Sequence, residues 1–216
     1  MTLLDGPRLA PANGRPATSL VVLLHGYGAD GNDLIDIGRA LAPVMPATAF
    51  ASPHAPEPCA DAPIGRQWFP LSLVDLDRLW PGVQQATPAL NAFLDAELLR
   101  LGLGDRNLVL IGFSQGAMMA LNAGPRRRSA IAGIIGYSGY LAGPEHLAEA
   151  AHRPPILLVH GEEDTTIPVI ALHAAAPALG AAGFEVEWHV RPGLGHGIDM
   201  DGLRLGAEFL TRVLKA

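Results

Sequence analysis

The sequence predicts an α/β protein in which a mostly parallel β-sheet carries helices on both faces. Short apolar runs alternate along the chain with segments of helical periodicity, and Gly or Pro bounds most of them. Several runs are apolar at every position, which is typical of strands covered on both faces, as in a parallel sheet. Strands that alternate with helices in this way indicate an α/β architecture.

Six segments have the length and composition of buried strands. Three of them contain the unbroken runs Leu-Val-Val-Leu-Leu, Leu-Val-Leu-Ile and Ile-Leu-Leu-Val. Each is short and bounded by turn-forming residues, which favours a strand over a buried helix. The six expected strands are Ser19–Leu24, Thr48–Ala51, Asn107–Gly112, Ile131–Tyr137, Ile156–Val159 and Glu185–Val190.

Helices are expected between and after these strands. Either Asp30 or Asn32 can cap the first, and Gly124 ends the third. Pro88 leaves the first turn of the second helix open, because proline lacks the N–H that a helix interior uses. The residues that define the helices are Leu34, Ile37 and Leu41; Ala86, Leu90, Phe93 and Leu101; Gln115–Ala123; Leu172, Ala176 and Leu179; and Leu203, Ala207, Leu210 and Leu214.

Residues 53–82 interrupt this alternation. The segment contains six of the 19 prolines and two of the three tryptophans. A long irregular stretch inside a compact domain is usually functional or disordered, and aromatic residues favour the functional alternative. A chain of 216 residues suits one domain. We therefore expect a single domain over residues 1–216, with an irregular insertion at about 53–82 near the functional site.

Composition and charge exclude several classes of protein. The net charge of −6 disfavours a nucleic-acid partner, because an acidic surface repels phosphate backbones. The single cysteine, Cys59, excludes an internal disulfide and a Cys-rich zinc site. The N-terminus lacks the apolar run of a signal peptide, and the charge-free stretch Ser129–Pro144 is shorter than the about 20 residues of a membrane span. We expect a cytoplasmic protein without stable membrane insertion.

The pentapeptide Gly112-Phe113-Ser114-Gln115-Gly116 matches the pattern Gly-x-Ser-x-Gly. An apolar strand leads into it and a helix leaves it, so Ser114 is expected on a sharp, strained strand-to-helix turn that only small flanking residues permit. A helix N-terminus also favours negative charge. We interpret Ser114 as a nucleophile. The similar segment Gly136–Tyr140 lacks the second glycine of the pattern and is interpreted as a strand end.

A serine hydroxyl needs a base within hydrogen-bond reach to act as a nucleophile at neutral pH. Of the eight histidines, His196 lies between the last strand and the last helix, at the same sheet edge as the serine turn. Asp164 follows the strand 156–159 and is the candidate acid that orients the imidazole. The order Ser114, Asp164, His196 is the order of α/β-hydrolases. The alternatives to the aspartate are Glu162, Glu163, Asp199 and Asp201.

An acyl-transfer site also needs two preorganised donors for the oxyanion. One is expected to be the backbone N–H of Gln115, the residue after the nucleophile. The other is expected in the glycine-rich loop 24–30, where we select the N–H of Tyr27. The alternative is that this loop merely connects a strand to a helix.

Five motifs occur in order across most of the chain. Together they resemble the phospholipase/carboxylesterase family of serine hydrolases, which includes the acyl-protein thioesterases. The motifs are Leu-His-Gly-Tyr-Gly-Ala-Asp-Gly (24–31), Ser-Pro-His-Ala-Pro (52–56), Gly-Phe-Ser-Gln-Gly (112–116), His-Gly-x-x-Asp-x-x-Ile-Pro (160–168) and Gly-His-Gly (195–197).

The resemblance implies an α/β-hydrolase fold and a triad of Ser114, Asp164 and His196. It places Tyr27 and Gln115 as the oxyanion donors, without metal or organic cofactor. It also implies hydrolysis of carboxylic esters, thioesters or lysophospholipids. We expect a small-molecule ester with a small to medium acyl chain, with thioester or lysophospholipid as the alternative, and a monomer or homodimer. The family commonly has Leu at the position of Tyr27, so its substrate preference is not carried over.

Apolar residues of the 53–82 insertion offer a surface that suits an acyl chain, with Trp68, Phe69 and Leu71 as candidates. The alternative is that they only tether a long loop to the core. The basic run Arg126–Arg128 is interpreted as a solvated helix end that complements the helix dipole.

Two other classes of function stay open. One is a non-catalytic α/β-hydrolase scaffold that binds a ligand. The other is a metal-dependent hydrolase that uses His25, His160 or Asp164, although no His-x-His or His-Glu-x-x-His spacing supports it.

Overall fold

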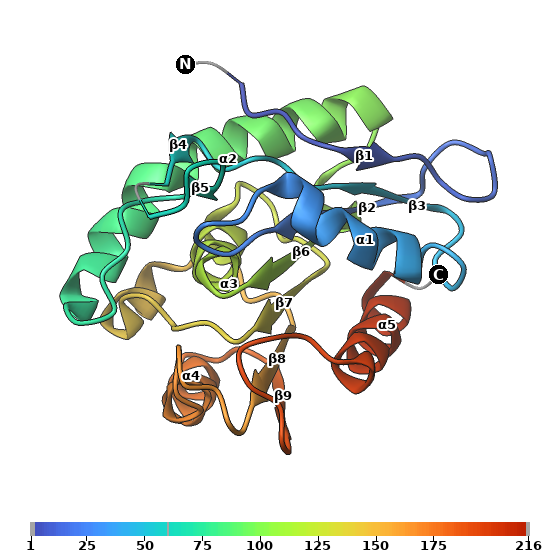
Figure 1. Ribbon diagram of the computed structural model, residues 1–216. Helices are drawn as coiled ribbons and strands as arrows, with labels where there is room; N and C mark the ends of the chain where they lie inside the picture. The colour runs from blue at the N-terminus through green and yellow to red at the C-terminus, as the bar shows by residue number, and fades with distance from the viewer. Residues whose placement is uncertain (1–2, 60, 215–216) are drawn as a thin grey trace.

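The computed structural model describes residues 3–59 and 61–214, and a seven-stranded sheet runs through these two ranges. Its strands are β1 (Arg8–Leu9), β2 (Ser19–Leu24), β3 (Thr48–Ala51), β6 (Leu108–Phe113), β7 (Gly133–Tyr137), β8 (Ile156–Gly161) and β9 (Val186–Arg191). Their order is β1-β3-β2-β6-β7-β8-β9, and neighbours are parallel except for β1, which is antiparallel to β3 (Figure 1).

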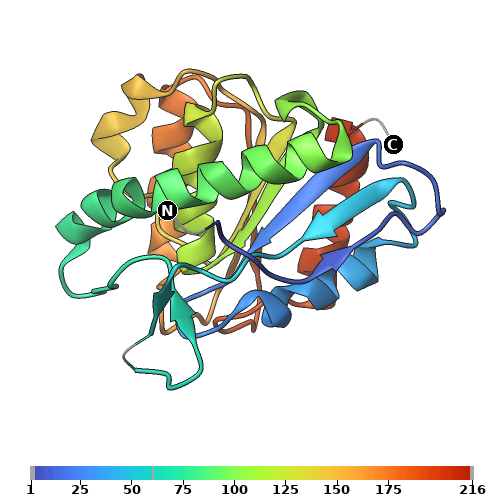
Figure 2. The same ribbon diagram turned by 90° about the horizontal axis from the view of Figure 1, so that it is seen from above.

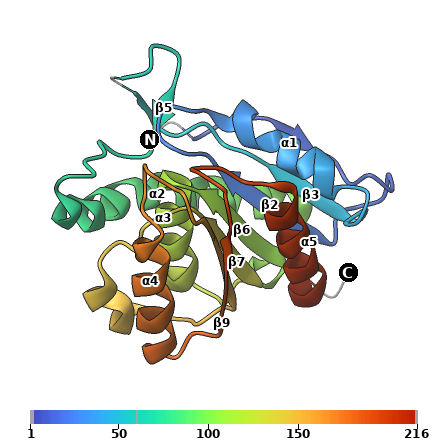
Figure 3. The same cartoon turned by 60° about the horizontal axis from the view of Figure 1, so that its bottom comes forward.

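Helices cover both faces of this sheet. On one side lie α2 (Leu79–Leu101), α3 (Gln115–Ala123) and α4 (Ile170–Ala181). On the other lie α1 (Gly31–Leu41) and α5 (Met200–Leu214), as Figures 1 and 3 both show. The predicted fold class is therefore confirmed. In the part of the chain that the structure describes, none of the helices combines the length and the apolar character that crossing a membrane requires.

The unbroken apolar runs arise because both faces of the central strands are buried. In β2, Leu20, Val22 and Leu24 belong to the apolar core on the α2–α4 side. Val21 and Leu23 point into the second core, under α1 and α5. Each fully buried side chain of this kind contributes roughly 1.5–3 kcal/mol, so the two cores together fix the strand between them.

Several element boundaries differ from the prediction. The strand expected at 107–112 lies one residue later, because Asn107 closes a 3₁₀ turn, η2 (Asp105–Asn107). Pro88 lies inside α2 rather than at its start. The buried face of α2 contains Leu90, Phe93 and Leu94, and such packing outweighs the cost of an interior proline. Asp30 caps α1, since its carboxylate accepts the N–H of Asn32 at 2.7 Å.

The 53–82 insertion is less irregular than expected. It contains a short antiparallel hairpin of β4 (Glu57–Pro58) and β5 (Arg66–Gln67), followed by the 3₁₀ helix η1 (Leu76–Arg78). Its last four residues, Leu79–Gly82, already form the first turn of α2, so the predicted end of the irregular segment was wrong. The hairpin projects from the body of the molecule beyond the sheet (Figure 2).

The basic run Arg126–Arg128 is not a solvated helix end. The side chain of Arg127 is 6% exposed and forms ion pairs with Asp95 and Asp105, both at 2.6 Å. Arg126 stacks over the Trp80 ring at 4.8 Å. Only the third arginine of the run is exposed. Two of the three charges thus connect α2 and its following loop to the end of α3.

Candidate active site

Ser114 lies between β6 and α3 on a strained turn. Its φ of +54° lies in the left-handed region that non-glycine residues rarely adopt. A Cβ atom at Gly112 would overlap the carbonyl oxygen of Gly116, and one at Gly116 would overlap that of Leu24. The two glycines of the pentapeptide are therefore required by the close approach of β6, α3 and the end of β2.

The register of the parallel strands brings the predicted site residues to one edge of the sheet. Leu24 pairs with Gly112, and Gly161 pairs with Arg191. The loops that leave these positions carry Ser114, Asp164 and His196, together with the glycine-rich loop after β2. Residues distant in sequence therefore share one rim, as expected at the carboxyl ends of an α/β sheet.

Asp164 and His196 are in direct contact. His196 Nδ1 lies 2.7 Å from Asp164 Oδ2, and the carboxylate side chain is 0% exposed. The other carboxylate oxygen accepts the N–H groups of Thr166 at 2.9 Å and Ile167 at 2.8 Å. Burial opposes ionisation, but these hydrogen bonds outweigh it and hold the pKa of Asp164 below its ordinary value. The carboxylate is therefore charged at neutral pH.

The acids that competed with Asp164 in the sequence do not contact His196. Glu162 and Glu163 are exposed. Asp199 accepts Arg191 Nε at 3.0 Å, and Asp201 also pairs with that arginine. These two aspartates fix the chain beyond the histidine loop rather than the histidine itself.

The loop that carries His196 is packed tightly against the loop that carries Asp164. The N–H of Glu163 donates to the carbonyl of Leu194 at 2.9 Å. The His196 ring lies against the ring of Phe113, the residue before Ser114, with ring centroids 4.8 Å apart. Within the described residues no hydrogen bond joins the Ser114 hydroxyl to His196. Catalytic hydrogen bonds are often loose before substrate binds.

The glycine-rich loop lies directly over Ser114. A Cβ atom at Gly26 would lie 3.3 Å from Ser114 Cβ, so the loop approaches the Ser114 side chain closely. Tyr27 is the residue after Gly26. Its phenol donates to Asp61 Oδ2 at 2.8 Å, which turns the side chain toward the β4–β5 hairpin. Gln115 begins α3, where the first N–H groups have no partner within the helix.

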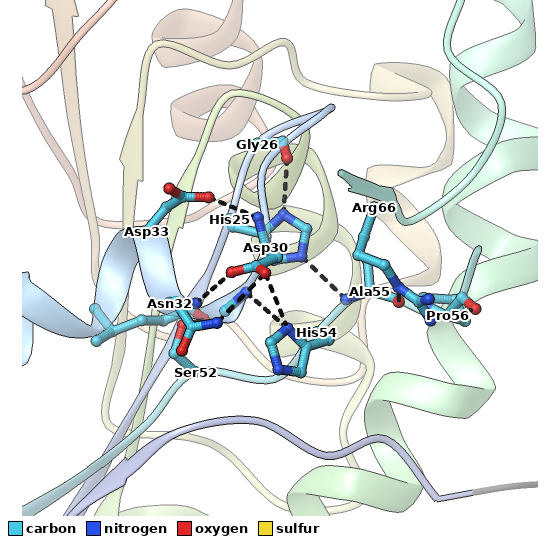
Figure 4. A network of polar contacts seen from close by, with 12 residues as sticks. His25, Gly26, Asp30, Asn32, Asp33, Ser52, His54, Ala55, Pro56 and Arg66 are labelled. Carbon is cyan, nitrogen blue, oxygen red and sulfur yellow. Dashed lines mark hydrogen bonds and ion pairs between the residues drawn. The ribbon is translucent and has the colours of Figure 1, made fainter. Parts of the chain in front are cut away.

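His25, at the end of β2, holds the glycine-rich loop as a neutral imidazole (Figure 4). Its Nε2 accepts the N–H of Ala55 at 3.0 Å, so the proton resides on Nδ1, which donates to the carbonyl of Gly26 at 2.8 Å. Burial lowers the pKa of His25, in agreement with this assignment. His160 is buried in the same way, and its Nε2 lies 2.7 Å from the carbonyl of Ile167.

Neither histidine belongs to an arrangement of metal ligands. Across the ranges 3–59 and 61–214, no group of three or more His, Cys, Asp or Glu side chains is placed to hold a metal ion. Both imidazoles instead bond to backbone groups of neighbouring loops.

The structure places Trp68 and Phe69 in the core rather than on a surface. They are 1% and 0% exposed. The Phe69 ring packs so closely on Gly82 that a Cβ atom there would overlap it. Leu71 is partly buried against the same core. Trp68 and Phe69 therefore offer no surface to an acyl chain. Their packing agrees with the alternative that they tether the loop.

The fold, the strained serine elbow and the buried aspartate–histidine pair define an α/β-hydrolase. The model of the phospholipase/carboxylesterase family matches residues 10–214. The chain belongs to this family and is an ester-hydrolysing enzyme of the carboxylesterase type.

Proteins that are similar to this chain are named as esterases and acyl-protein thioesterases. Esterase YpfH of Escherichia coli K12 is 32% identical over 91% of this chain and 83% of its own length. Acyl-protein thioesterase 1 of Gibberella zeae is 28% identical over 91% of each chain. The crystal structure of esterase PE8 superposes with a TM-score of 0.94 and 42% identity, and covers 99% of this chain and 100% of its own.

Proposed function

We propose that the protein hydrolyses carboxylic esters of small to medium acyl chains through a Ser-His-Asp triad and an acyl-enzyme intermediate, within one catalytic domain. The observation that carries the proposal is the 2.7 Å contact between His196 and the buried Asp164. The imidazole of that pair lies on Phe113, the residue before the strained Ser114.

In the acylation step, Ser114 Oγ attacks the acyl carbon while His196 Nε2 takes its proton. Asp164 holds Nδ1–H of the ring, so that Nε2 presents a lone pair, and stabilises the imidazolium without itself taking the proton. The backbone N–H groups of Tyr27 and Gln115 bind the oxyanion of the tetrahedral intermediate.

In the second half of the cycle, the leaving alkoxide departs with the proton held by His196. Water then attacks the acyl-serine, again with the histidine as base, and releases the carboxylic acid and free Ser114. A thiolate leaves by the same route. The relative named acyl-protein thioesterase 1 supports thioester hydrolysis as the second candidate activity.

The test compares two serines with similar backbone strain. Ser138 follows β7 with φ of +48°, and no described group bonds its buried hydroxyl. Against esters and thioesters of graded acyl length, we expect Ser114→Ala to lower kcat by several orders of magnitude and Ser138→Ala to retain activity. Near-wild-type turnover by a folded Ser114→Ala variant would overturn the proposed function. The same panel identifies the preferred leaving group and acyl length.

A further inference from the structure

The 66–69 segment (Arg66–Phe69) of the insertion contacts both parts of the proposed oxyanion hole. On the glycine-rich loop, Gly28 N–H donates to the carbonyl of Arg66 at 2.9 Å, and Arg66 N–H donates to the carbonyl of Ala29 at 2.8 Å. These two backbone hydrogen bonds join the glycine-rich loop to the 66–69 segment in the way that two paired β-strands are joined. A side chain at Gly65 would overlap the Gly28 carbonyl, so the approach is close.

The side chain of Gln115 binds the same segment from the other direction. Its Oε1 accepts the N–H of Trp68 at 2.9 Å, and its Nε2 donates to the carbonyl of Phe69 at 2.8 Å. Because one partner is a donor and the other an acceptor, the orientation of the amide is fixed. Gln115 is fully buried, and no mechanistic step uses its side chain.

Trp68 connects Gln115 with the glycine-rich loop. Its backbone N–H bonds to Gln115, and its indole Nε1 donates to the carbonyl of His25 at 3.0 Å. His25 in turn donates to the carbonyl of Gly26. In a trans peptide the C=O and the following N–H point in opposite directions, so fixing the Gly26 carbonyl also fixes the N–H of Tyr27.

We propose that Trp68 and the side chain of Gln115 are positioning residues that set the separation and direction of the two oxyanion donors. This inference rests on the proposed function. One donor lies on the glycine-rich loop and the other at the start of α3, so local chain geometry alone does not hold them together. Preorganised donors stabilise an oxyanion because they need no reorganisation during the reaction. A small shift between them therefore affects the tetrahedral state more than the bound substrate.

The test removes the hydrogen bonds of one side chain at a time and keeps most of its bulk. Trp68→Phe removes the indole N–H that bonds to the His25 carbonyl. Gln115→Met removes both hydrogen bonds of the side-chain amide but keeps the backbone N–H of residue 115. We expect each to lower kcat by about 10- to 100-fold with KM within about twofold, somewhat less than the loss of a whole donor. Trp80→Phe is the matched control, because Trp80 stacks on His146 outside this network and its variant should keep the wild-type kcat.

Affinity for a trifluoromethyl ketone, which forms a tetrahedral oxyanion on the serine, separates positioning from simple destabilisation. We expect this affinity to fall in parallel with kcat/KM in the folded Trp68→Phe and Gln115→Met proteins, measured well below their melting temperatures. A lower melting temperature with unchanged kcat and inhibitor affinity would overturn the inference, as would a raised KM with unchanged kcat. Those results would leave the proposed function intact, whereas an active Ser114→Ala variant would remove its basis.

Discussion

Replacing Asp164 with Asn tests the proposed role of His196 as the base and of Asp164 as the residue that orients it. The asparagine oxygen can still accept the two backbone N–H groups that Asp164 Oδ1 accepts from Thr166 and Ile167. Its amide nitrogen then faces His196 Nδ1, where Asp164 Oδ2 lies 2.7 Å away in the native protein. An amide donor there stabilises the tautomer with the proton on Nε2, and this tautomer cannot accept the serine proton.

The expected cost is about 10⁴-fold in kcat, or about 5 kcal/mol of transition-state stabilisation. Steady-state hydrolysis of a chromogenic ester at neutral pH measures it, and circular dichroism verifies that the variant is folded. Asp199→Asn is the control, because Asp199 pairs with Arg191 and does not contact the imidazole. A folded Asp164→Asn enzyme with kcat within tenfold of wild type would refute the reasoning.

Two predictions concern stability. Arg127→Ala leaves the nearly buried Asp105 without its ion-pair partner and should lower the free energy of unfolding by about 3 kcal/mol, as measured by urea denaturation. A loss below about 1 kcal/mol would identify the pair as a weak surface interaction. Burial lowers the pKa of His25 and of His160, so below pH of about 6.5 the unfolded chain binds protons that the native chain does not. Stability should therefore fall between pH 7.5 and 5.5, by up to about 1.4 kcal/mol per pH unit for each histidine, and an unchanged urea midpoint would contradict this assignment.

The sequence was most informative where local pattern and burial agree. The strand Ser19–Leu24 begins and ends where predicted, because both of its faces are apolar and a glycine follows soon after. The strand β1 was missed, since two residues carry no periodicity. The serine turn was identifiable because the pattern Gly-x-Ser-x-Gly lies within one short segment, although the contact that excludes a side chain at Gly116 comes from Leu24 in β2.

Properties set by distant partners were not accessible from the sequence. Nothing in the run Arg126–Arg128 indicates that its middle residue meets two aspartates from other parts of the chain. The apolar character of Trp68 indicated burial but not whether it faces the core or a ligand. Asp164 competed with two adjacent glutamates until the structure placed its side chain against His196. The catalytic roles of these residues stay predictions.

We propose that Ser114, His196 and two backbone donors act on one tetrahedral centre. A crystal structure of the protein treated with a fluorophosphonate measures this directly, because the phosphoryl adduct mimics the tetrahedral intermediate. We predict a bond from phosphorus to Ser114 Oγ, with the phosphoryl oxygen about 2.7–3.1 Å from the N–H groups of Tyr27 and Gln115. An adduct on another residue, or a phosphoryl oxygen directed away from both donors, would contradict the account.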